Sequence, residues 1–358
     1  MNGENSNRMS ANLGKPVEIS QISRELKKLW EADEAATNAS LMNLVVYSER
    51  AGTLAENSRT VFDFTKDHAC RAILVEMQRD TSELSAEAWI TAHCHLAGGS
   101  KTVCCEQISF LLKGRAIGRL RNTLFANLNS DLPLVFWWQG ELSDLFEERL
   151  YKHTDRFLFD SSDWSNAVTG YKQITQTLSE TQGQLVVQDM EWTRTFGYRL
   201  ALAGLFDDPV ALESLSQIDR LSIEGNPIHR VSQLMFVSWL AVQAQWTFNK
   251  EKSGAKVLVF ENQEGSAITC EVTSSEGSSA ISKVAMQANE VRVSVCRQTG
   301  SSHLQLLLEA PGHRVEQNAP ADPNDTADLI AEQLSRGSKN SLFKKISPMF
   351  EELLASED

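Results

Sequence analysis

The sequence predicts an α/β domain followed by an α+β domain. In the first half, short β-branched and aromatic runs alternate with segments of helical periodicity, the pattern of a sheet covered by helices. In the second half, helical segments precede five short β-rich runs separated by Gly, Ser and Asn. The 358 residues also exceed one typical domain of ~150 residues. We expect a mixed sheet with flanking helices over residues 16–170, and helices on an antiparallel sheet over residues 171–312.

Two further segments complete the predicted organisation. Residues 1–15 are rich in Asn, Ser and Gly and contain no apolar run, so we expect a disordered leader there. Residues 313–358 are expected to form a linker and C-terminal helices, because a polar stretch precedes two segments of helical spacing.

The elements of the first domain follow from periodicity and turn residues. Apolar residues at helical spacing predict an amphipathic helix over residues 19–30. The Ala-Gly-Gly-Ser run at residues 97–100 suits a hairpin turn between two antiparallel strands. The predicted strands are residues 41–47, 72–77, 87–96, 102–112, 134–138 and 156–160, with helices over residues 115–129 and 142–154.

The second domain is predicted to pack helices on a strand meander. The helical segments are residues 171–181, 192–206, 209–217 and 228–246, with a short strand at residues 220–224. The five β-rich runs are residues 256–261, 266–272, 282–286, 291–297 and 303–310. Residues 311–325 are a predicted linker, and residues 326–334 and 348–354 are predicted helices.

Charge and hydropathy exclude two classes of partner. With 34 Lys and Arg against 47 Asp and Glu, the net charge of −13 argues against a surface that neutralises nucleic-acid phosphates. The most apolar stretch, residues 234–246, is broken by polar residues and is shorter than the ~20 residues of a membrane span. The N-terminus has no apolar signal region, so we expect a cytoplasmic protein.

The six cysteines are scattered along the chain, so reduced thiols are expected. If the hairpin pairs about the two glycines, His93 and His95 share one face and Cys104 lies across from His93. That arrangement approaches a three-ligand metal set, although the spacing matches no zinc module. Small residues such as Cys also fill buried strands, and packing is the favoured interpretation; no metal is therefore predicted.

Motifs for common enzyme chemistry are missing. No G-x-G-x-x-G follows the first predicted strand, and no G-x-S-x-G elbow occurs. The Gly-Gly-Ser-Lys-Thr run at residues 98–102 lacks the spacing of a phosphate loop and precedes a strand rather than a helix. We therefore expect no catalytic residue and no cofactor.

Two groups of side chains nevertheless suggest a site. Asp155, Asp160 and Asp163 surround a strand end, where α/β sheets place ligands; the alternative is that they form turns, caps and solvated ion pairs. Trp137 and Trp138 are adjacent on a predicted strand and must point to opposite faces. They are either two core anchors or include one contact to a pocket or partner.

Several segments resemble one known family, the glucose-6-phosphate dehydrogenase assembly proteins often called OpcA. The most specific are SDLPLVFWWQG at residues 130–140 and QLMFVSWLAVQAQW at residues 233–246. The other matching segments are PVEISQISRELKKLW (16–30), LMNLVV (41–46), HACRAIL (68–74), VCCEQISF (103–110), DRFLFDSSDW (155–164) and DMEWTRTFGYRLALAGLFD (189–207).

The resemblance implies a non-catalytic protein that promotes assembly and activity of glucose-6-phosphate dehydrogenase, the NADP-dependent entry enzyme of the oxidative pentose phosphate pathway. The family supplies no catalytic residue. No cysteine follows Cys296, so family redox control through a C-terminal pair is not carried over. Candidate partner contacts, chosen because they lie in the most family-specific segments, are Trp137, Trp138, Asp160, Trp164 and Trp239.

The alternative from another class is a sugar-phosphate- or nucleotide-binding enzyme that uses a strand-end pocket near Asp160. Arginines that converge on an anion would favour it, in particular Arg71, Arg156 or Arg199. A broad apolar patch rimmed by charge would favour the assembly factor.

Overall fold

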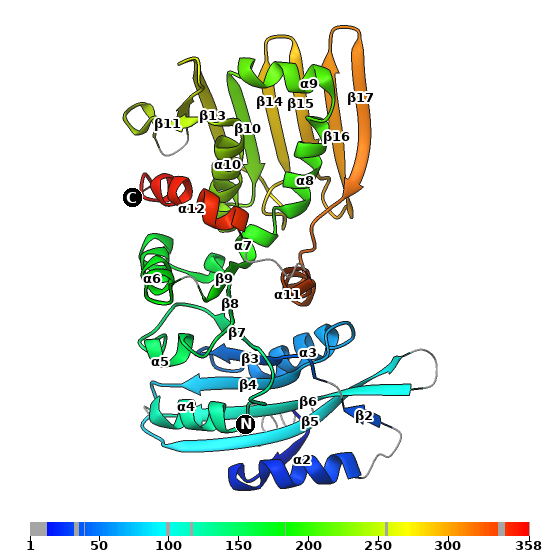
Figure 1. Ribbon diagram of the computed structural model, residues 1–358, viewed down its shortest axis with the longest axis vertical. Coiled ribbons are helices and arrows are strands. Elements are labelled where there is room, and N and C mark those ends of the chain that lie inside the picture. The colour runs from blue at the N-terminus through cyan, green and yellow to red at the C-terminus, as the bar shows by residue number, and fades with distance from the viewer. Residues whose placement is uncertain are drawn as a thin grey trace. The chain divides into compact units, whose positions relative to one another are not determined.

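A computed structural model describes residues 13–31, 36–38, 40–97, 101–114, 117–182, 184–254, 257–335 and 341–357 (Figure 1). The chain divides into two compact units, each assembled from three segments. The first unit comprises Met1–Asp163, Gln173–Gln188 and Thr326–Ser335, and the second comprises Trp164–Lys172, Asp189–Asp325 and Arg336–Asp358. The domain boundaries expected at residues 170 and 312 stay predictions.

The first unit is built on a nine-stranded mixed sheet with the order β1-β5-β6-β4-β3-β7-β8-β9, and β2 also pairs with β6. Five neighbouring strands, from β6 to β8, run parallel, and β5 is antiparallel to β6. The strands are β1 (Lys15–Val17), β2 (Ala36–Asn38), β3 (Asn43–Ser48), β4 (Arg71–Gln78), β5 (Ser85–Ala97), β6 (Lys101–Lys113), β7 (Leu134–Gln139), β8 (Arg156–Phe159) and β9 (Val186–Asp189).

The strand order identifies the topology. Without the antiparallel strand β5 and its neighbour β1, six strands cross the sheet in the order β6, β4, β3, β7, β8 and β9. Numbered by their order along the chain, these strands read 3-2-1-4-5-6. This is the order of the dinucleotide-binding α/β fold, in which ligands lie beyond the carboxyl ends of the strands where the order reverses. In this chain that point lies between β3 and β7, both of which are buried throughout.

Aromatic residues fill the core beside these strands. Trp138 lies 4.5 Å from the ring of Tyr47 on the neighbouring strand, and Phe146 lies 4.6 Å from Phe157. Strands buried on both faces are continuous apolar runs, which explains why residues 41–47 and 134–138 could be recognised. The helices over this part of the chain are α2 (Ile22–Glu31), α3 (Leu54–Phe64), α4 (Ile117–Ala126), α5 (Glu148–Tyr151), α6 (Ala167–Glu180) and α11 (Thr326–Ser335).

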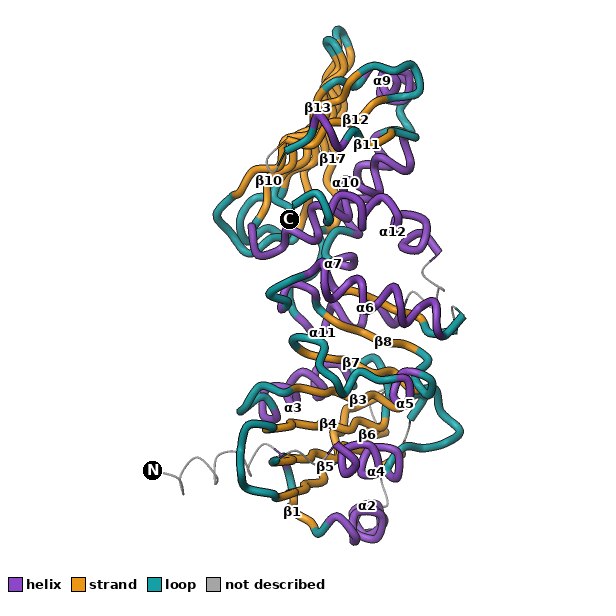
Figure 2. The backbone as a smooth tube through the Cα atoms, turned by 90° about the vertical axis from the view of Figure 1, so that its left-hand side faces the viewer, coloured by secondary structure: helices purple, strands orange, loops and turns teal. Residues whose placement is uncertain are grey.

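The second unit is an eight-stranded sheet with the order β11-β12-β13-β10-β14-β15-β16-β17. Its strands are β10 (Arg220–Gly225), β11 (Thr247–Phe248), β12 (Val257–Glu261), β13 (Ala267–Ser274), β14 (Lys283–Ala288), β15 (Val291–Cys296), β16 (His303–Ala310) and β17 (His313–Pro320). Its helices are α7 (Met190–Thr193), α8 (Phe196–Leu205), α9 (Pro209–Ser214), α10 (Arg230–Ala244) and α12 (Ser341–Leu354). Figure 2 shows the labelled helices α9, α10 and α12 on one side of this sheet.

The predicted fold class is confirmed, with corrections to single elements. The second sheet is mixed rather than antiparallel, because β10 pairs parallel with β13. The linker expected over residues 311–325 contains β17, a polar strand that pairs with β16 and is the edge strand among the described residues of this sheet. A sheet edge needs no continuous apolar run, so the polar composition was misleading. The last helix begins at Ser341 and contains Pro348 inside it, whereas the proline had indicated a start.

The expected leader also differs from the structure at its end. Leu13 is fully buried and β1 begins at Lys15, so the last residues of the 1–15 segment are ordered. Residues 1–12 lie outside the described residues. None of the helices that the structure describes is long and apolar enough to cross a membrane.

Candidate functional site

The carboxyl edge of the first sheet is the place where this topology positions a ligand. The side chains that reach it follow β3, β4, β7 and β8, and they include both sequence-predicted and unexpected residues. At this edge the side chains make buried hydrogen bonds with one another and with the backbone. The three central side chains are Glu76, Asn57 and Gln139.

Glu76 occupies the N-terminus of helix α3. Its side chain is fully buried, and one carboxylate oxygen accepts the backbone N–H of Leu54, the first residue of α3, at 3.2 Å. The other oxygen accepts the side-chain amide of Gln78 at 2.7 Å. The first N–H groups of a helix have no partner within the helix, and its N-terminus favours negative charge. The side chain of Glu76 therefore takes up an N–H group at the helix end where this topology can bind a phosphate.

Asn57 and Gln139 connect helix α3 with strand β7. Their amides exchange two hydrogen bonds, at 2.9 and 2.8 Å, and both side chains are buried. Because each amide donates to the other and accepts from it, the pair needs no further partner for these atoms. The bonds lie across the position where the strand order reverses, so the chain's own side chains fill that crevice.

The outer part of the edge carries an ion-pair network. Arg79 lies 2.6 Å from Asp144 and 3.5 Å from Glu49. Glu49 also accepts the hydroxyl of Tyr47 at 2.9 Å and the hydroxyl of Ser143. Burial, together with the neighbouring Glu49 carboxylate, raises the pKa of Tyr47 far above its usual range. Its hydroxyl therefore stays protonated at neutral pH and serves as a structural donor.

The three aspartates near β8 are engaged in local structure. Asp160 accepts the backbone N–H and the hydroxyl of Ser162, at 3.1 and 2.6 Å, which is a turn. Asp155 accepts the N–H of Leu134 at 2.7 Å, at the amino end of β7. Asp163 is exposed at the end of the same short turn. The turn bonds are made by Asp160, whereas the turn had been expected at Asp163. Asp155 precedes β8 and so lies at the opposite end of that strand from Asp160.

The arginines that would favour an anion-binding enzyme do not converge. Arg71 and Arg156 are the first residues of β4 and β8, so they lie at the opposite edge of the sheet from Asp160. Arg71 lies 3.5 Å from Glu106. Arg199 belongs to the second unit, where it stacks 3.4 Å over the ring of Trp192. The structure therefore brings no pair of these cations to the strand-end position.

The four candidate tryptophans are buried in the described structure. Trp137, Trp138, Trp164 and Trp239 expose between 1 and 8% of their surface. Trp138 donates its indole N–H to the carbonyl of Glu141 at 2.9 Å, whereas the indole nitrogen of Trp137 makes no hydrogen bond with the described residues. Trp137 and Trp138 lie in the first unit near Asp160; Trp164 and Trp239 lie in the second. Their role as partner contacts stays a prediction.

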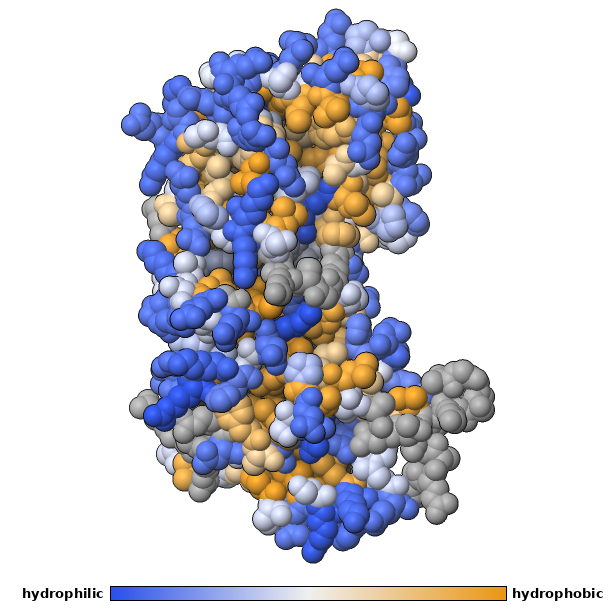
Figure 3. All heavy atoms as spheres, in the orientation of Figure 1, coloured by the Kyte–Doolittle hydropathy of each residue, from blue (hydrophilic) through white to orange (hydrophobic). Residues whose placement is uncertain are grey.

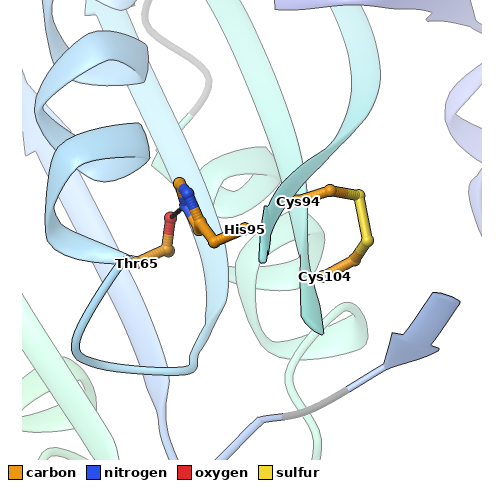
Figure 4. The surroundings of a disulfide bond; sticks show 4 residues. All are labelled: Thr65, Cys94, His95 and Cys104. Carbon is orange, nitrogen blue, oxygen red and sulfur yellow. Dashed lines mark hydrogen bonds between the residues drawn. A yellow bond between two sulfur atoms is a disulfide. The ribbon is translucent and has the colours of Figure 1, made fainter. Parts of the chain in front are cut away.

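The hairpin of β5 and β6 overturns two expectations. Cys94 pairs with Cys104, and the two form a disulfide, so these thiols are not reduced in the structure (Figure 4). Cys104 lies across from Cys94 rather than from His93, whose partner is Cys105. The difference is a shift of one residue in strand register, which exchanges the faces. The turn residues 98–100 lie outside the described residues.

The histidines of this hairpin have protein partners. His93 hydrogen-bonds Gln107 at 2.7 Å, and His95 bonds the hydroxyl of Thr65 at 3.0 Å (Figure 4). Burial lowers the pKa of His93. Because Cys104 is disulfide-bonded, it is not available as a thiolate ligand. Among the described residues, no group of three or more His, Cys, Asp or Glu side chains is arranged to hold a metal ion.

Sequence reasoning missed Glu76, Asn57 and Gln139. One signal was present: Glu76 is the only charged residue within the apolar run AILVEM at residues 72–77. A carboxylate in a strand that is buried on both faces must have a specific partner. The partners are brought together by the fold, from residues 22 and 82 positions apart, and no local pattern encodes that pairing.

Two domain models match this chain in sequence. Residues 63–176 match the glucose-6-phosphate dehydrogenase subunit N-terminal domain, and residues 185–346 match the C-terminal domain of that subunit. Among curated proteins, the OxPP cycle protein OpcA of Synechocystis sp. is 24% identical over 196 residues, which are 54% of this chain and 40% of that protein. OpcA of Synechococcus elongatus is 22% identical over 290 residues, which are 73% of this chain and 62% of that protein. The matches thus span only 40 to 62% of these relatives' lengths.

Solved structures with a similar course of the chain share low sequence identity with it, as two of them show. A 3-ketoreductase from Actinomadura kijaniata has a TM-score of 0.48 and 10% identity, covering 88% of this chain and 95% of that one. An aldose-aldose oxidoreductase from Caulobacter crescentus has a TM-score of 0.46 and 9% identity, and the match covers 89% of this chain and 97% of that one. The two domain models match in order along the chain, and the curated relatives carry the same name, so the chain belongs to the OpcA family.

Proposed function

We propose that this protein is a non-catalytic assembly factor and activator of glucose-6-phosphate dehydrogenase, and that it thereby supports NADPH production in the oxidative pentose phosphate pathway. Family membership supports the partner, because both domain models carry the name of that dehydrogenase. The observation that carries the non-catalytic part is the buried carboxylate of Glu76 at the N-terminus of α3. A pyrophosphate at this helix end would need free backbone N–H groups, and the N–H of Leu54 is already bonded to Glu76.

The Glu76 bond opposes nucleotide binding at that position by occupying a helix N–H group. A pyrophosphate at the N-terminus of α3 would compete for the N–H group of Leu54, which already donates to Glu76. The Asn57–Gln139 pair fills the adjacent position. A phosphate-bearing cofactor would have to break these bonds before it could bind.

A protein without chemistry of its own can still raise an enzyme's activity. If it binds the assembled, active form of the dehydrogenase more tightly than the inactive form, it shifts that equilibrium by the ratio of the two affinities. A tenfold preference is worth about 1.4 kcal/mol. The effect saturates when the assembled enzyme is fully bound.

The test is a titration of purified dehydrogenase from the same organism with this chain. At fixed NADP and glucose 6-phosphate, we expect a saturable rise in NADPH formation and co-elution of the two proteins on size exclusion. The chain alone should give no binding heat with NADP in calorimetry. A chain that binds NADP tightly by itself, and leaves the dehydrogenase rate and elution unchanged, would contradict the proposal.

Among the predicted contacts, Trp137 offers the cleanest variant. Its indole nitrogen makes no hydrogen bond with the described residues, so Trp137→Phe removes no described bond from the folded chain. Trp246→Phe is the matched control, because the Trp246 ring is as buried as that of Trp137, at 4% exposed, and is not a predicted contact. Both substitutions leave a cavity and lower the unfolding midpoint, because both rings are buried. If the Trp137 indole contacts the dehydrogenase, Trp137→Phe weakens activation well below that midpoint, whereas Trp246→Phe does not. Unchanged activation would remove Trp137 from the contact set.

A further inference from the structure

The second sheet has one face that no described helix covers. Alternate residues along its strands are buried beneath the helices, including Leu221, Ile223, Val293 and Val295. Figure 2 shows the labelled helices of this unit, α9, α10 and α12, on one side of the strands. The residues between these buried positions form the outer face, on which Ala285 and Ser294 are themselves only 8% and 6% exposed. In Figure 3 the helix-covered side is turned toward the viewer, and the outer face is hidden.

Long and small side chains are sorted into two neighbouring rows on this face. Arg220, Gln287 and Arg292 lie directly opposite one another across β10, β14 and β15, and they form the long row. Two residues further along each strand, Ser222, Ala285 and Ser294 lie opposite one another and form the small row. Neighbours within a row are ~4.8 Å apart, and the two rows are ~6.7 Å apart.

A hollow lies where the long row adjoins the small row. Its volume is about 390 Å³, and its lining includes Ser222 and Ala285 of the small row and all three residues of the long row. Both arginines are exposed, and neither makes an ion pair or a hydrogen bond with the described residues. Gln287 is held by the carbonyl of Val291 at 3.2 Å. Arg220 and Arg292, two cationic side chains without a described partner, therefore lie next to the small side chains of the hollow.

The charges on the two rows have opposite signs. The long row continues across β16 and β17 with Glu309 and Arg314, so it carries three arginines and one glutamate. The small row continues with Glu271 on β13, and with Leu307 and Glu316 on β16 and β17. It carries no basic residue among these positions. The long row is net positive, and the adjacent small row is net negative.

A two-fold axis matches these rows to each other. Consider two copies whose outer faces lie against each other, with the two-fold axis in the plane between the sheets. If this axis is perpendicular to the strands and passes midway between the two rows, the long row of each copy faces the small row of the other. Arg220 and Arg292 then enter the space above Ser222, Ala285 and Ser294, and the basic row meets the acidic one. Both shape and charge are self-complementary, as an isologous interface requires.

We propose that this face is the interface of a homodimer, whose occupant is the same face of a second copy of the chain. Seven strands at ~4.8 Å spacing and five residues at ~3.3 Å give a flat area of roughly 600 Å² per copy. A standard stable interface buries about 800 Å² per partner, and the raised long row adds area to the flat estimate. The proposal does not depend on the dehydrogenase, because it concerns the purified chain alone.

Exchanging long and small side chains tests the pairing. The full chain is studied by sedimentation velocity over a concentration series that reaches about 100 μM. Wild type should show a dimer that dissociates on dilution. Ser222→Arg places a long cation in the hollow, opposite Arg220 of the other copy, and the clash occurs twice per dimer. We expect the dissociation constant to rise at least about tenfold, which corresponds to 1.4 kcal/mol.

The compensating variant combines Ser222→Arg with Arg220→Ser, which reverses the two rows at that position and should restore wild-type association. Glu213→Arg is the control, because Glu213 is an exposed residue of α9 on the helix side of the sheet. Thermal unfolding of each variant shows that the fold is retained, since Ser222 is on the outer face. A monomer at every concentration, an unaltered dimer with Ser222→Arg, or failure of the exchange to restore association would overturn the proposal.

Discussion

Replacing Glu76 with alanine should destabilise the first unit by about 2–4 kcal/mol. The change leaves the N–H of Leu54 without an acceptor inside the protein, which costs about 1–3 kcal/mol for a buried donor. It also removes the negative charge from the N-terminus of α3, worth about 0.3–1 kcal/mol. The side-chain amide of Gln78 loses its partner as well. Glu76→Gln should cost less, because its carbonyl oxygen can still accept from Leu54.

Urea unfolding followed by circular dichroism measures this loss, and hydrogen exchange of the α3 amides assigns it to the first unit. A loss of 3 kcal/mol corresponds to a shift of about 6–12 °C in the unfolding midpoint for a domain of 150–250 residues. Glu83→Ala is the control, because that side chain is 63% exposed and forms only a surface ion pair with Lys113. A Glu76→Ala variant within 0.5 kcal/mol of wild type would refute the structural role of the carboxylate.

Three further outcomes are expected. Gly170→Ala should cost about 1–3 kcal/mol in urea unfolding, because the new methyl group would lie 2.3 Å from the Trp164 ring; an unchanged midpoint would contradict that close approach. Burial lowers the pKa of His93 below its ordinary 6.5, so the unfolded chain takes up a proton first and stability falls as pH drops below about 6.5; His93→Gln should flatten this fall between pH 5 and 7.5. Reducing the Cys94–Cys104 disulfide, which closes a loop with a sequence separation of 10, should destabilise the chain by about 2–3 kcal/mol, and equal stability with and without dithiothreitol would contradict it.

The sequence alone was enough to predict the strands and helices in which consecutive residues are all buried. Strands such as β3 and β7 are covered on both faces, so their apolar runs are visible without any knowledge of their neighbours. Helix α10 was recognised in the same way, since residues 231–241 are all buried. Strand β17 was missed because it is polar and is the edge strand among the described residues of its sheet. The parallel pairing of β10 with β13 is a property of the whole sheet, and no local residue pattern determines it.

The candidate site shows the same division. Asp160 was correctly placed at a strand end, because the carboxyl edge follows from the strand itself. The bonds that fill the edge join Glu76 to Leu54 and Asn57 to Gln139, and they depend on how α3 packs against two strands. The cysteine pairing depended on a register shift of one residue, which two glycines in a turn leave open. Periodicity therefore identifies elements, whereas the contacts between elements decide the chemistry.

The most direct test of the proposed function is the concentration dependence of dehydrogenase assembly. Dehydrogenase activity and sedimentation are measured in the same samples over a dilution series, with and without a saturating amount of this chain. If the chain binds the assembled form preferentially, the dehydrogenase concentration at half-maximal assembly falls, and the activity curve moves with it. If both curves stay in place while the chain neither co-sediments nor changes the rate, the account of this protein as an assembly factor is contradicted.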